Sequence, residues 1–419
     1  MRLGVIADDF TGATDIASFL VKGGMQTVQM NSVPKATARI EADAIVISLK
    51  SRSCDTSLAI ADSLAALEWL KKQGCTHFYF KYCSTFDSTA QGNIGPVTDA
   101  LLEALDQTFT LLCPALPVNG RTVHFGHLFV NGVLLNESGM QHHPVTPMQD
   151  ANVTRLMDSQ AKGRTGLIDY KVIDQGVEAT TKAINELKSQ GCRYAVVDAF
   201  YESHLATIAA ASSDHVLLTG GSGLGFHLAQ FNSANKKAEQ SAAQLHSVQG
   251  SVVLSGSCST MTNEQVALYR EQAPSLAMNI ERCINDDAYI SEVTRWVLSN
   301  QDGDKAPMVF ATAEPEKLKQ IQIEYGAANA SEQVEVFFAK LTQNLKSSGI
   351  NTFIVAGGET SGVVTQNLGV AGFRISYEIA PGVPWVTGTE GAYNITLKSG
   401  NFGHPNFFAD AQEFLNVRH

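Results

Sequence analysis

Short apolar segments recur along the whole chain, and most are followed by a stretch in which apolar residues return every three or four positions. Short runs bounded by polar or glycine-rich residues predict buried strands, whereas the three-to-four spacing predicts amphipathic helices. The predicted strands are residues 3–7, 44–49, 77–81, 110–113, 166–172, 194–198, 216–219, 251–254, 308–313 and 352–356. This alternation of strands and helices predicts an α/β fold with mostly parallel sheets.

One polar segment interrupts the alternation. Residues 231–250 are rich in Ala, Ser, Gln and Lys and contain no predicted strand, so we interpret them as the connection between two domains. A chain of 419 residues is also long for a single hydrophobic core. We therefore predict two α/β domains, residues 1–235 and residues 250–419.

Composition narrows the classes of function. A net charge of −11 argues against a surface that holds the phosphates of nucleic acid. The chain has no apolar run of about 18 residues, so we predict no membrane span, and its N-terminus turns polar at Asp8, too early for a signal peptide. The cysteines form no CxxC pair and are odd in number, a pattern that favours reduced thiols and a cytoplasmic protein.

A glycine-rich stretch near the C-terminus predicts a phosphate site. The predicted strand 352–356 breaks at Gly357 and Gly358, and a helical pattern resumes after Ser361. A strand, a glycine turn and a helix N-terminus leave free backbone N–H groups and a positive dipole end, which suit a phosphate. Thr360 or Ser361 could cap the helix or donate to an anion. The alternative is an ordinary turn with a helix cap.

A second glycine-bearing loop supports the phosphate interpretation. Residues 397–403 carry Gly400 and Gly403, and Lys398 stands between the two loops. Other nucleotide motifs are absent: the glycines of residues 220–225 lack the spacing of a dinucleotide fingerprint, and nothing matches a P-loop. An ATP site in this chain would therefore be built without a P-loop.

The first predicted strand ends in a cluster of acids. Asp8, Asp9 and Asp15 lie within eight residues, at the carboxyl end of a strand, where α/β sheets keep their ligands. Such a cluster is costly to pack unless a cation, a substrate hydroxyl or a helix N-terminus offsets it. The alternative is that Asp8 and Asp9 are helix caps on a solvated loop.

The strand 77–81 also ends in a polar loop, residues 82–95. It holds hydroxyls, a carboxylate, amides and two glycines, with Lys81 at its base. This density of small hydrogen-bonding groups suits a polyhydroxylated ligand, although a loop that bonds its own backbone is the alternative. His124 and His127 have no third ligand nearby, so we predict no metal site there. We expect Trp385 to fill the core rather than flank an adenine.

Taken together, these segments resemble one family. Residues 8–12, 81–95, 357–362 and 398–403 occur in the order found in the four-carbon acid sugar kinases, and the similarity spans essentially the whole chain. Residues 81–89 and 114–122 are most similar to the 3-oxo-tetronate kinase branch. The threonate and erythronate branches tend to have Leu-Arg where this chain has Ala90-Gln91, so one basic group that could hold a carboxylate is missing here.

The resemblance implies two Rossmann-like domains, an N-terminal one for the acid sugar and a C-terminal one for ATP, with the reaction in a cleft between them. It also implies phosphorylation of the C4 hydroxyl of a 3-oxo-tetronate. Our candidates for ATP binding are Ser257, Ser259, Gly357, Gly358, Glu359, Thr360, Ser361, Gly362, Gly400 and Gly403. Of these, Ser259, Gly358 through Ser361, and Gly403 match nucleotide-binding positions of the family. Mg²⁺ is expected to bridge the phosphates.

Roles in the N-terminal domain remain hypotheses. Candidates for substrate binding are Thr11, Arg52, Lys81, Ser84, Asp87, Ser88, Asn93 and Arg121. Among them, Lys81, Arg121 or Arg52 would pair with the substrate carboxylate. Asp8 or Asp9 would accept the hydroxyl proton or hold Mg²⁺ through water, and Asp87 is the competing base.

Two alternative functions stay open, and a third is disfavoured. One is a threonate or erythronate kinase of the same family, and another is a non-catalytic nucleotide-binding sensor, against which the presence of Asp8 and Asp9 argues. An aldolase or dehydrogenase is disfavoured, because the chain lacks a dinucleotide fingerprint, a metal cluster and a Schiff-base lysine in an apolar strand. The sequence fixes neither the substrate stereochemistry nor the oligomeric state, so a homo-oligomer stays open.

Overall fold

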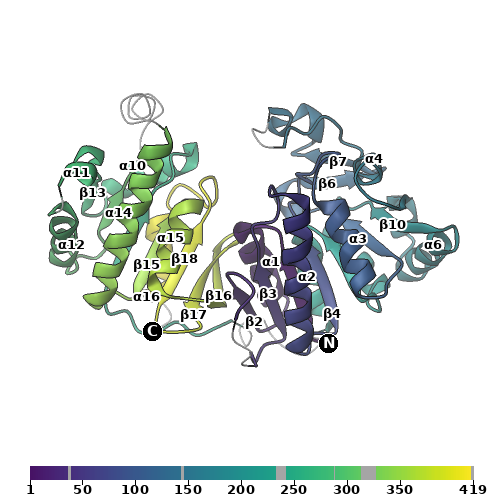
Figure 1. Cartoon of the computed structure of the whole chain (residues 1–419), viewed down its shortest axis with the longest axis horizontal. Coiled ribbons are helices and arrows are strands. Elements are labelled where there is room, and N and C mark those ends of the chain that lie inside the picture. Colours follow the sequence, from purple (N-terminus) through teal and green to yellow (C-terminus); the bar gives the residue numbers. More distant parts are fainter. Residues whose placement is uncertain (36–38, 143–145, 233–241, 287, 313–326, 417–419) are drawn as a thin grey trace. The chain divides into compact units, whose positions relative to one another are not determined.

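The predicted apolar runs form the strands of two compact units in the computed structural model (Figure 1). The structure describes residues 1–35, 39–142, 146–232, 242–286, 288–312 and 327–416. Unit 1 is Met1–Ala242 and unit 2 is Ala243–His419. The helix that precedes the predicted connection runs to Asn232, and residues 233–241 lie outside the described part of the chain.

Unit 1 is built on a parallel sheet, in the order β2-β3-β1-β4-β11-β5-β10-β9. The strands are β1 Leu3–Ala7, β2 Thr27–Met30, β3 Ala44–Ser48, β4 His77–Lys81, β5 Thr110–Cys113, β9 Arg164–Ile168, β10 Cys192–Val197 and β11 Leu217–Gly220. β1, β3 and β4 are adjacent, and Ala7 pairs with both Ser48 and Lys81. The loops that follow these three strands therefore meet at one edge of the sheet.

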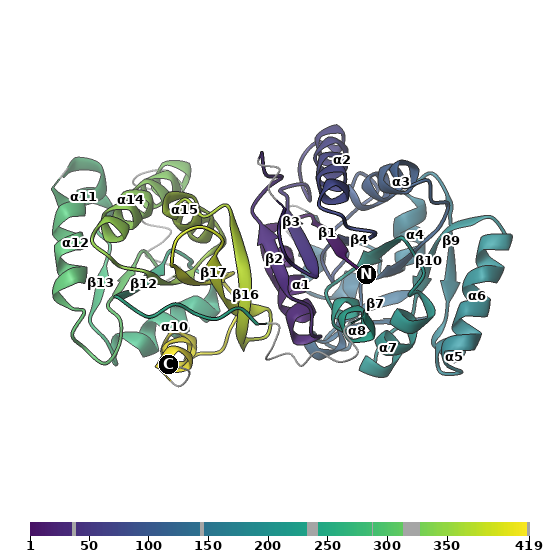
Figure 2. The same cartoon turned by 90° about the horizontal axis from the view of Figure 1, so that it is seen from below.

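Helices cover both faces of this sheet, as Figure 2 shows for α2 and α3 on one face and α7 and α8 on the other. The helices of unit 1 are α1 Phe10–Lys22, α2 Thr56–Lys72, α3 Ile94–Ala104, α4 Val153–Asp158, α5 Tyr170–Ile173, α6 Val177–Ser189, α7 Glu202–Ala211 and α8 Gly223–Asn232, with 3₁₀ turns η1 Pro117–Asn119, η2 Leu135–Glu137 and η3 Gly139–His142. Because both faces are covered, the central strands β1 and β3 are buried along their whole length.

A separate antiparallel sheet of unit 1 contains β6 Arg121–His124, β7 His127–Val130 and β8 Val133–Leu134. His124 pairs with His127 across a tight turn, so the two histidines lie in a β-hairpin. The prediction of a strand over residues 166–172 is wrong in its second half. β9 ends at Ile168, and Asp169 caps α5 by accepting a hydrogen bond from the N–H of Val172 at 3.3 Å, which turns the following apolar residues into a helix.

Unit 2 has a mixed sheet in the order β13-β14-β12-β15-β18-β17-β16. The strands are β12 Ser251–Ser255, β13 Ser275–Ala277, β14 Met308–Phe310, β15 Thr352–Ala356, β16 Gly372–Ala380, β17 Val383–Gly388 and β18 Asn394–Lys398. The pairs from β13 to β18 are parallel, and the pairs of β17 with β18 and with β16 are antiparallel. The two units together confirm the predicted α/β class with mostly parallel sheets.

The helices of unit 2 are α10 Thr260–Arg270, α11 Ile280–Asn285, α12 Tyr289–Ser299, α14 Ala327–Ser347, α15 Gly358–Leu368 and α16 Phe407–Asn416. Figure 2 shows α14 and α15 on one face of the sheet and α10 and α16 on the other. Within the described ranges of both units, no helix combines the length and the apolar character that a membrane crossing needs.

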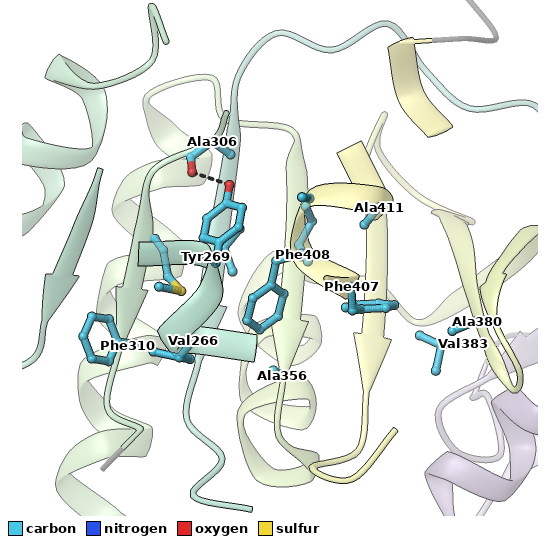
Figure 3. Close-up of a cluster of buried hydrophobic side chains, with 14 of the residues drawn as sticks. Val266, Tyr269, Ala306, Phe310, Ala356, Ala380, Val383, Phe407, Phe408 and Ala411 are labelled. Carbon is cyan, nitrogen blue, oxygen red and sulfur yellow. Dashed lines mark hydrogen bonds between the residues drawn. The ribbon is translucent and has the colours of Figure 1, made fainter. Parts of the chain in front are cut away.

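Aromatic side chains fill the core between α10, α16 and the sheet of unit 2 (Figure 3). Trp385 is fully buried there, and its indole N–H donates to the carbonyl of Ala411 at 3.0 Å, so the expected core position is confirmed. Tyr269 is also buried. Its hydroxyl donates to the carbonyl of Ala306 and accepts a hydrogen bond from the side-chain amide of Gln412, both at 2.7 Å.

We expect Tyr269→Phe to destabilise the protein by about 1–3 kcal/mol, because the carbonyl of Ala306 and the amide of Gln412 each lose a buried partner. Urea unfolding followed by tryptophan fluorescence measures this loss. Tyr201→Phe is the matched control, because Tyr201 is 62% exposed, and its free energy of unfolding should change by less than about 0.5 kcal/mol. Equal stability of the two variants would contradict the prediction.

Candidate active site

The loops after β1, β3 and β4 are joined by backbone hydrogen bonds at the carboxyl edge of the sheet in unit 1. The N–H of Asp8 donates to the carbonyl of Lys81 at 3.0 Å, and the N–H of Ser51 donates to the carbonyl of Asp8 at 3.0 Å. Side chains from the three loops are therefore held within hydrogen-bonding range of each other. This is the edge at which open α/β sheets bind their ligands.

Arg52 lies among the three predicted catalytic carboxylates. Its Nε and Nη2 donate to the two oxygens of Asp8, each at 2.9 Å, and Nη2 is also 3.0 Å from Oδ1 of Asp9. Its Nη1 is 3.7 Å from Oδ2 of Asp87. A planar guanidinium suits this bidentate contact with a carboxylate. The guanidinium thus offsets the charges of Asp8, Asp9 and Asp87, and Lys81 adds to its effect on Asp8.

Burial and charge act in opposite directions at this cluster. Burial raises the pKa of the Asp8 carboxyl, and Arg52 opposes that rise. For Arg52, burial acts to lower the pKa, but the carboxylates, Asp8 first, outweigh it and raise the pKa above its usual value. Arg52 therefore stays charged, and Asp8 and Arg52 form a buried ion pair.

Asp9 differs from Asp8 in its exposure and in its partners. The Asp9 side chain is 32% exposed, whereas that of Asp8 is 6% exposed. Asp9 caps α1, because its Oδ1 accepts a hydrogen bond from the N–H of Gly12 at 2.7 Å. The alternative that Asp8 and Asp9 are helix caps on a solvated loop is therefore correct for Asp9, whose side chain reaches solvent, and wrong for Asp8, which is buried.

The loop after β4 is held partly by its own contacts. The carboxylate of Asp87 is buried and accepts a hydrogen bond from the hydroxyl of Thr85 at 2.6 Å. The Asn93 amide donates to the carbonyls of Ser51 and Cys54, each at 2.9 Å, and so ties this loop to the loop of Arg52. Within the loop, Oγ of Ser88 accepts a hydrogen bond from the N–H of Ile94 at 3.4 Å, so the alternative of a loop that bonds its own backbone holds in part, and several of its side chains also line a small pocket.

That pocket lies in unit 1 and is lined by Asp8, Arg52, Asp87, Ser88 and Asn93, together with neighbouring apolar side chains. The structure thus brings five of the predicted site residues to one place. The lining combines a cation, two carboxylates, a hydroxyl and an amide. The enclosed space measures about 10 Å³, room for about one water, so it marks where polar side chains gather and is not a cavity that could hold a sugar acid.

Gln160 belongs to this site but was not predicted. Its side-chain oxygen accepts hydrogen bonds from the hydroxyl of Ser88 and from the N–H of Gly95, each at 2.8 Å. It therefore fixes both ends of the segment that contains Asn93. Nothing in the sequence signals this contact, because Gln160 follows a short helix, α4, that carries no recognisable motif.

The remaining predicted residues of unit 1 are placed less centrally. Lys81 is buried and its ammonium donates to the carbonyl of Tyr82 at 2.7 Å. Thr11 lies in the first turn of α1, and Ser84 is half-buried in the loop after β4. Arg121 opens β6 and donates to the carbonyl of Asn119; within the described residues the structure records no contact between Arg121 and the cluster around Arg52.

In unit 2, the loops after β12, β15 and β18 meet in the same way. The N–H of Gly256 donates to the carbonyl of Ala356, and the N–H of Gly357 donates to the carbonyl of Lys398, both at 2.9 Å. A Cβ atom at Gly256 would lie 2.1 Å from the hydroxyl oxygen of Thr360. The first two loops are thus packed so tightly that only glycine fits at this position.

The loop after β18 packs against the loop after β12. A Cβ atom at Gly400 would lie 2.6 Å from Oγ of Ser257 and 2.8 Å from Oγ of Ser259. Ser259 caps α10 by accepting a hydrogen bond from the N–H of Thr262 at 3.3 Å. Gly403 has a φ of 81°, which favours glycine, and so allows the sharp turn before α16.

The N-terminus of α15 is open. Gly357 is the N-cap residue, with a φ of 120° and no side-chain capping hydrogen bond, so the expectation that Thr360 or Ser361 caps this helix is wrong. Gly358 and Glu359 are exposed, and a Cβ atom at Gly358 or Gly362 would meet no atom within 4 Å. Without a side-chain cap, the first N–H groups of the helix remain available to an anion.

Ser361 adds a second unsatisfied group to this helix start. Its side chain is buried, and its hydroxyl has no hydrogen-bond partner among the described residues. Buried polar groups are normally paired, so an unpaired hydroxyl in the first turn of α15 suits a site that takes a polar ligand. No set of three or more His, Cys, Asp and Glu side chains placed to hold a metal ion is found within the described ranges of either unit.

Comparisons with known proteins match the sequence of this chain to one family. A family model described as a sugar-binding N-terminal domain matches residues 3–228, and one described as a nucleotide-binding C-terminal domain matches residues 252–408. A 3-oxo-tetronate kinase of Brucella melitensis is 55% identical over 99% of this chain and 96% of its own length. Another, from Haemophilus influenzae, is 55% identical over 98% of this chain and 99% of its own length.

A solved structure agrees with these matches. A crystal structure of a Haemophilus influenzae protein superposes with a TM-score of 0.90 at 55% identity, and covers 98% of this chain and 100% of that one. Both units are therefore matched in sequence and in fold. The chain belongs to the four-carbon acid sugar kinase family, as its sequence motifs predicted, and it is a kinase.

Proposed function

We propose that this protein transfers the γ-phosphoryl group of ATP to the C4 hydroxyl of a 3-oxo-tetronate and so forms a 3-oxo-tetronate 4-phosphate. The observation that carries this choice of substrate is the 55% identity, over nearly the full length, to relatives named 3-oxo-tetronate kinase. We assign the acid sugar to the domain of residues 1–235 and ATP to the domain of residues 250–419. The free cysteines are in keeping with a cytoplasmic enzyme.

We assign the general base to Asp9. Asp8 is buried and both of its oxygens accept hydrogen bonds from Arg52, so it is poorly placed to take a proton from a substrate. Asp87 is also buried, and its Oδ1 accepts a hydrogen bond from Thr85. The Asp9 carboxylate is the most exposed of the three and lies at the start of α1. Asp8 then serves as the counter-ion that keeps Arg52 in place.

The substrate carboxylate needs a cation, and we assign this role to Lys81 in preference to Arg52. The donors of Arg52 already face carboxylates. The Lys81 ammonium makes one hydrogen bond within the described chain, to the carbonyl of Tyr82, so two of its protons remain for a ligand. A Cβ atom at Gly12 would lie 3.0 Å from this ammonium, so glycine keeps the approach to Lys81 open.

For the phosphates, we assign the open N-terminus of α15 and the hydroxyls of Ser257, Ser259 and Ser361. Backbone N–H groups and a helix dipole stabilise the negative charge that phosphoryl transfer develops. Mg²⁺ neutralises part of that charge when it is bound, and it usually keeps several waters and takes only one or two carboxylates beside the phosphates. The described residues hold no cluster of three metal-ligating side chains, so water and the phosphate oxygens would supply most of its ligands.

An assay of ADP release against a panel of acids tests this function. We expect the 3-oxo-tetronates to be phosphorylated with a kcat/KM at least about tenfold above that of threonate or erythronate, since loss of one well-placed polar contact costs more than 1.4 kcal/mol. Preference for threonate or erythronate would reassign the chain to another branch of the family. ATP binding without ADP release on any acid would indicate a nucleotide sensor.

A further inference from the structure

Lys398 is a buried lysine with no acidic partner. It is the last residue of β18, whose other residues are uncharged, and it is 2% exposed. Within the described part of the chain, no carboxylate lies within 4.0 Å of its ammonium; its partners are a hydroxyl and two carbonyls. Buried charges are usually paired with an opposite charge, so this lysine lacks its usual compensation.

The Lys398 ammonium ties together two of the three loops that form the candidate nucleotide site. It donates to Oγ1 of Thr262 at 2.9 Å, to the carbonyl of Ser399 at 3.2 Å and to the carbonyl of Gly400 at 2.8 Å. The hydroxyl of Thr262 in turn donates to the carbonyl of Gly400 at 2.7 Å and accepts from Oγ of Ser259 at 3.1 Å. Because Ser259 lies in the loop after β12, this contact connects that loop to the loop after β18.

The carbonyl of Lys398 reaches the third loop, because it accepts the hydrogen bond of the N–H of Gly357. Its ammonium also sets the direction of the peptides that follow. In a planar trans peptide the carbonyl and the next N–H point in opposite directions. With the carbonyls of Ser399 and Gly400 turned toward the ammonium, the N–H groups of Gly400 and Asn401 point away from it, and no hydrogen bond within the described chain uses them.

We propose that Lys398 is a positioning residue of the nucleotide site: its ammonium holds the loop after β18 so that the N–H groups of Gly400 and Asn401 are turned toward a phosphate, and the bound triphosphate supplies the missing negative charge. This inference rests on the nucleotide half of the proposed function. It assigns to Lys398 a role for which the known phosphate motifs use a lysine in the glycine loop itself. Here the lysine acts from the strand beneath the loop.

Because few other groups around Lys398 can titrate, its protonation can be measured as proton uptake when ATP binds. Burial lowers the pKa of Lys398 to about 7. The titratable groups on the elements packed around it are few: β15 and β17 carry none, the first turn of α10 has no acid, and the adjoining segments contribute Cys258, Glu359 and His404. Glu359 is exposed, and His404 faces Asp410 at 3.4 Å. An anion bound near the ammonium should restore its proton.

Titration calorimetry with ATP, in two buffers of different ionisation enthalpy, tests this at pH 8. The phosphates are fully ionised there, because their last pKa is about 6. We expect the wild type to take up about one proton on binding ATP, and Lys398→Met to take up none and to bind ATP about 10- to 100-fold more weakly. The KM of Lys398→Met for the acid sugar should stay unchanged.

Lys346→Met is the matched control, because Lys346 also donates to a backbone carbonyl, that of Leu368, but at the opposite end of α15. It should bind ATP and take up a proton as the wild type does. Unchanged ATP affinity in Lys398→Met, or a wild type that binds ATP without proton uptake, overturns the assignment. If circular dichroism shows that Lys398→Met is unfolded, the proton uptake of the wild type on binding ATP still tests the assignment.

These outcomes separate the assignment from the proposed function. Calorimetry with ATP alone needs no acid sugar. A wild type that binds ATP with proton uptake, yet phosphorylates no tetronate, would refute the proposed reaction and support the role of Lys398. A wild type that phosphorylates 3-oxo-tetronates without proton uptake on binding ATP would support the proposed reaction and refute the role of Lys398.

Discussion

Asp9→Asn is expected to lower kcat for the acid sugar by about 10²- to 10⁴-fold, the usual contribution of a general base. Asparagine has nearly the same size and caps a helix as well as aspartate does, so the hydrogen bond from the N–H of Gly12 to this side chain is kept. What is lost is the ability to take the proton of the C4 hydroxyl. The release of ADP measures kcat, and calorimetry with ATP should give an unchanged affinity.

Asp55→Asn is the matched control for this variant. Asp55 caps α2 in the same unit and accepts a hydrogen bond from the N–H of Ser57 at 2.9 Å, but it lies outside the set of candidate site residues. Its kcat and its stability should match those of the wild type. If Asp9→Asn keeps kcat within about fivefold of the wild type, Asp9 is not the base, since general bases contribute more than that.

Asp8→Asn distinguishes the chemical role of this loop from its electrostatic role. The change leaves the guanidinium of Arg52 buried without its bidentate partner. Because Asp9 and Asp87 still face the guanidinium, the loss is that of hydrogen bonds to a charged group, and we expect the free energy of unfolding to fall by about 1.5–3 kcal/mol. Asp9→Asn, at a partly exposed side chain, should be nearly neutral in the same urea titration. Equal stability losses in the two variants would contradict the division of roles.

The sequence predicted the fold well where strands are buried on both faces. Residues 3–7 and 77–81 are continuous apolar runs because helices cover both sides of the sheet, and such runs are visible without a structure. β16 was not predicted: its apolar and polar residues alternate, as in a half-buried strand, so it contains no continuous apolar run of the kind that marked the other strands. Its antiparallel pairing with β17 stabilises it, and pairing partners are not apparent from local composition.

The candidate site was predictable to the extent that parallel strands gather their carboxyl ends. That rule is enough to bring the loop of Asp8 together with the loop that begins at Lys81, and the loop of Gly358 together with that of Gly400. It does not predict which side chains bond to other groups of the same loops and are therefore not available to a ligand. Arg52 was predicted to bind substrate, but its contacts with three carboxylates depend on side-chain geometry.

Contacts over long sequence distances were beyond prediction. The lining of the pocket depends on Gln160, which lies 65 residues from its partner Gly95. The burial of Lys398 depends on Thr262, 136 residues away. Neither pair has a spacing that a helix or a strand imposes. In both cases a polar side chain, half-buried for Gln160 and buried for Lys398, hydrogen-bonds to a loop whose residues were already predicted to belong to a site.

Gly358→Val is expected to weaken ATP binding by about 5- to 150-fold, the effect of about 1–3 kcal/mol of steric conflict. The chain itself has room for the new side chain, because a Cβ atom at Gly358 would meet nothing within 4 Å. Gly358 is also the first residue of α15, where valine costs less than about 1 kcal/mol of helix stability. Any large loss of affinity therefore comes from a blocked ligand and not from a damaged fold.

Gly139→Val provides the matched control for Gly358→Val, because Gly139 has equally open surroundings and lies outside every candidate site. Its affinity for ATP and its turnover should equal those of the wild type. In Gly358→Val the KM for the acid sugar should stay unchanged, since that ligand is assigned to unit 1. Parallel losses of ATP and acid-sugar binding would point to misfolding. Unchanged ATP affinity would mean that phosphate does not approach the N-terminus of α15, and the nucleotide site would have to lie elsewhere in unit 2.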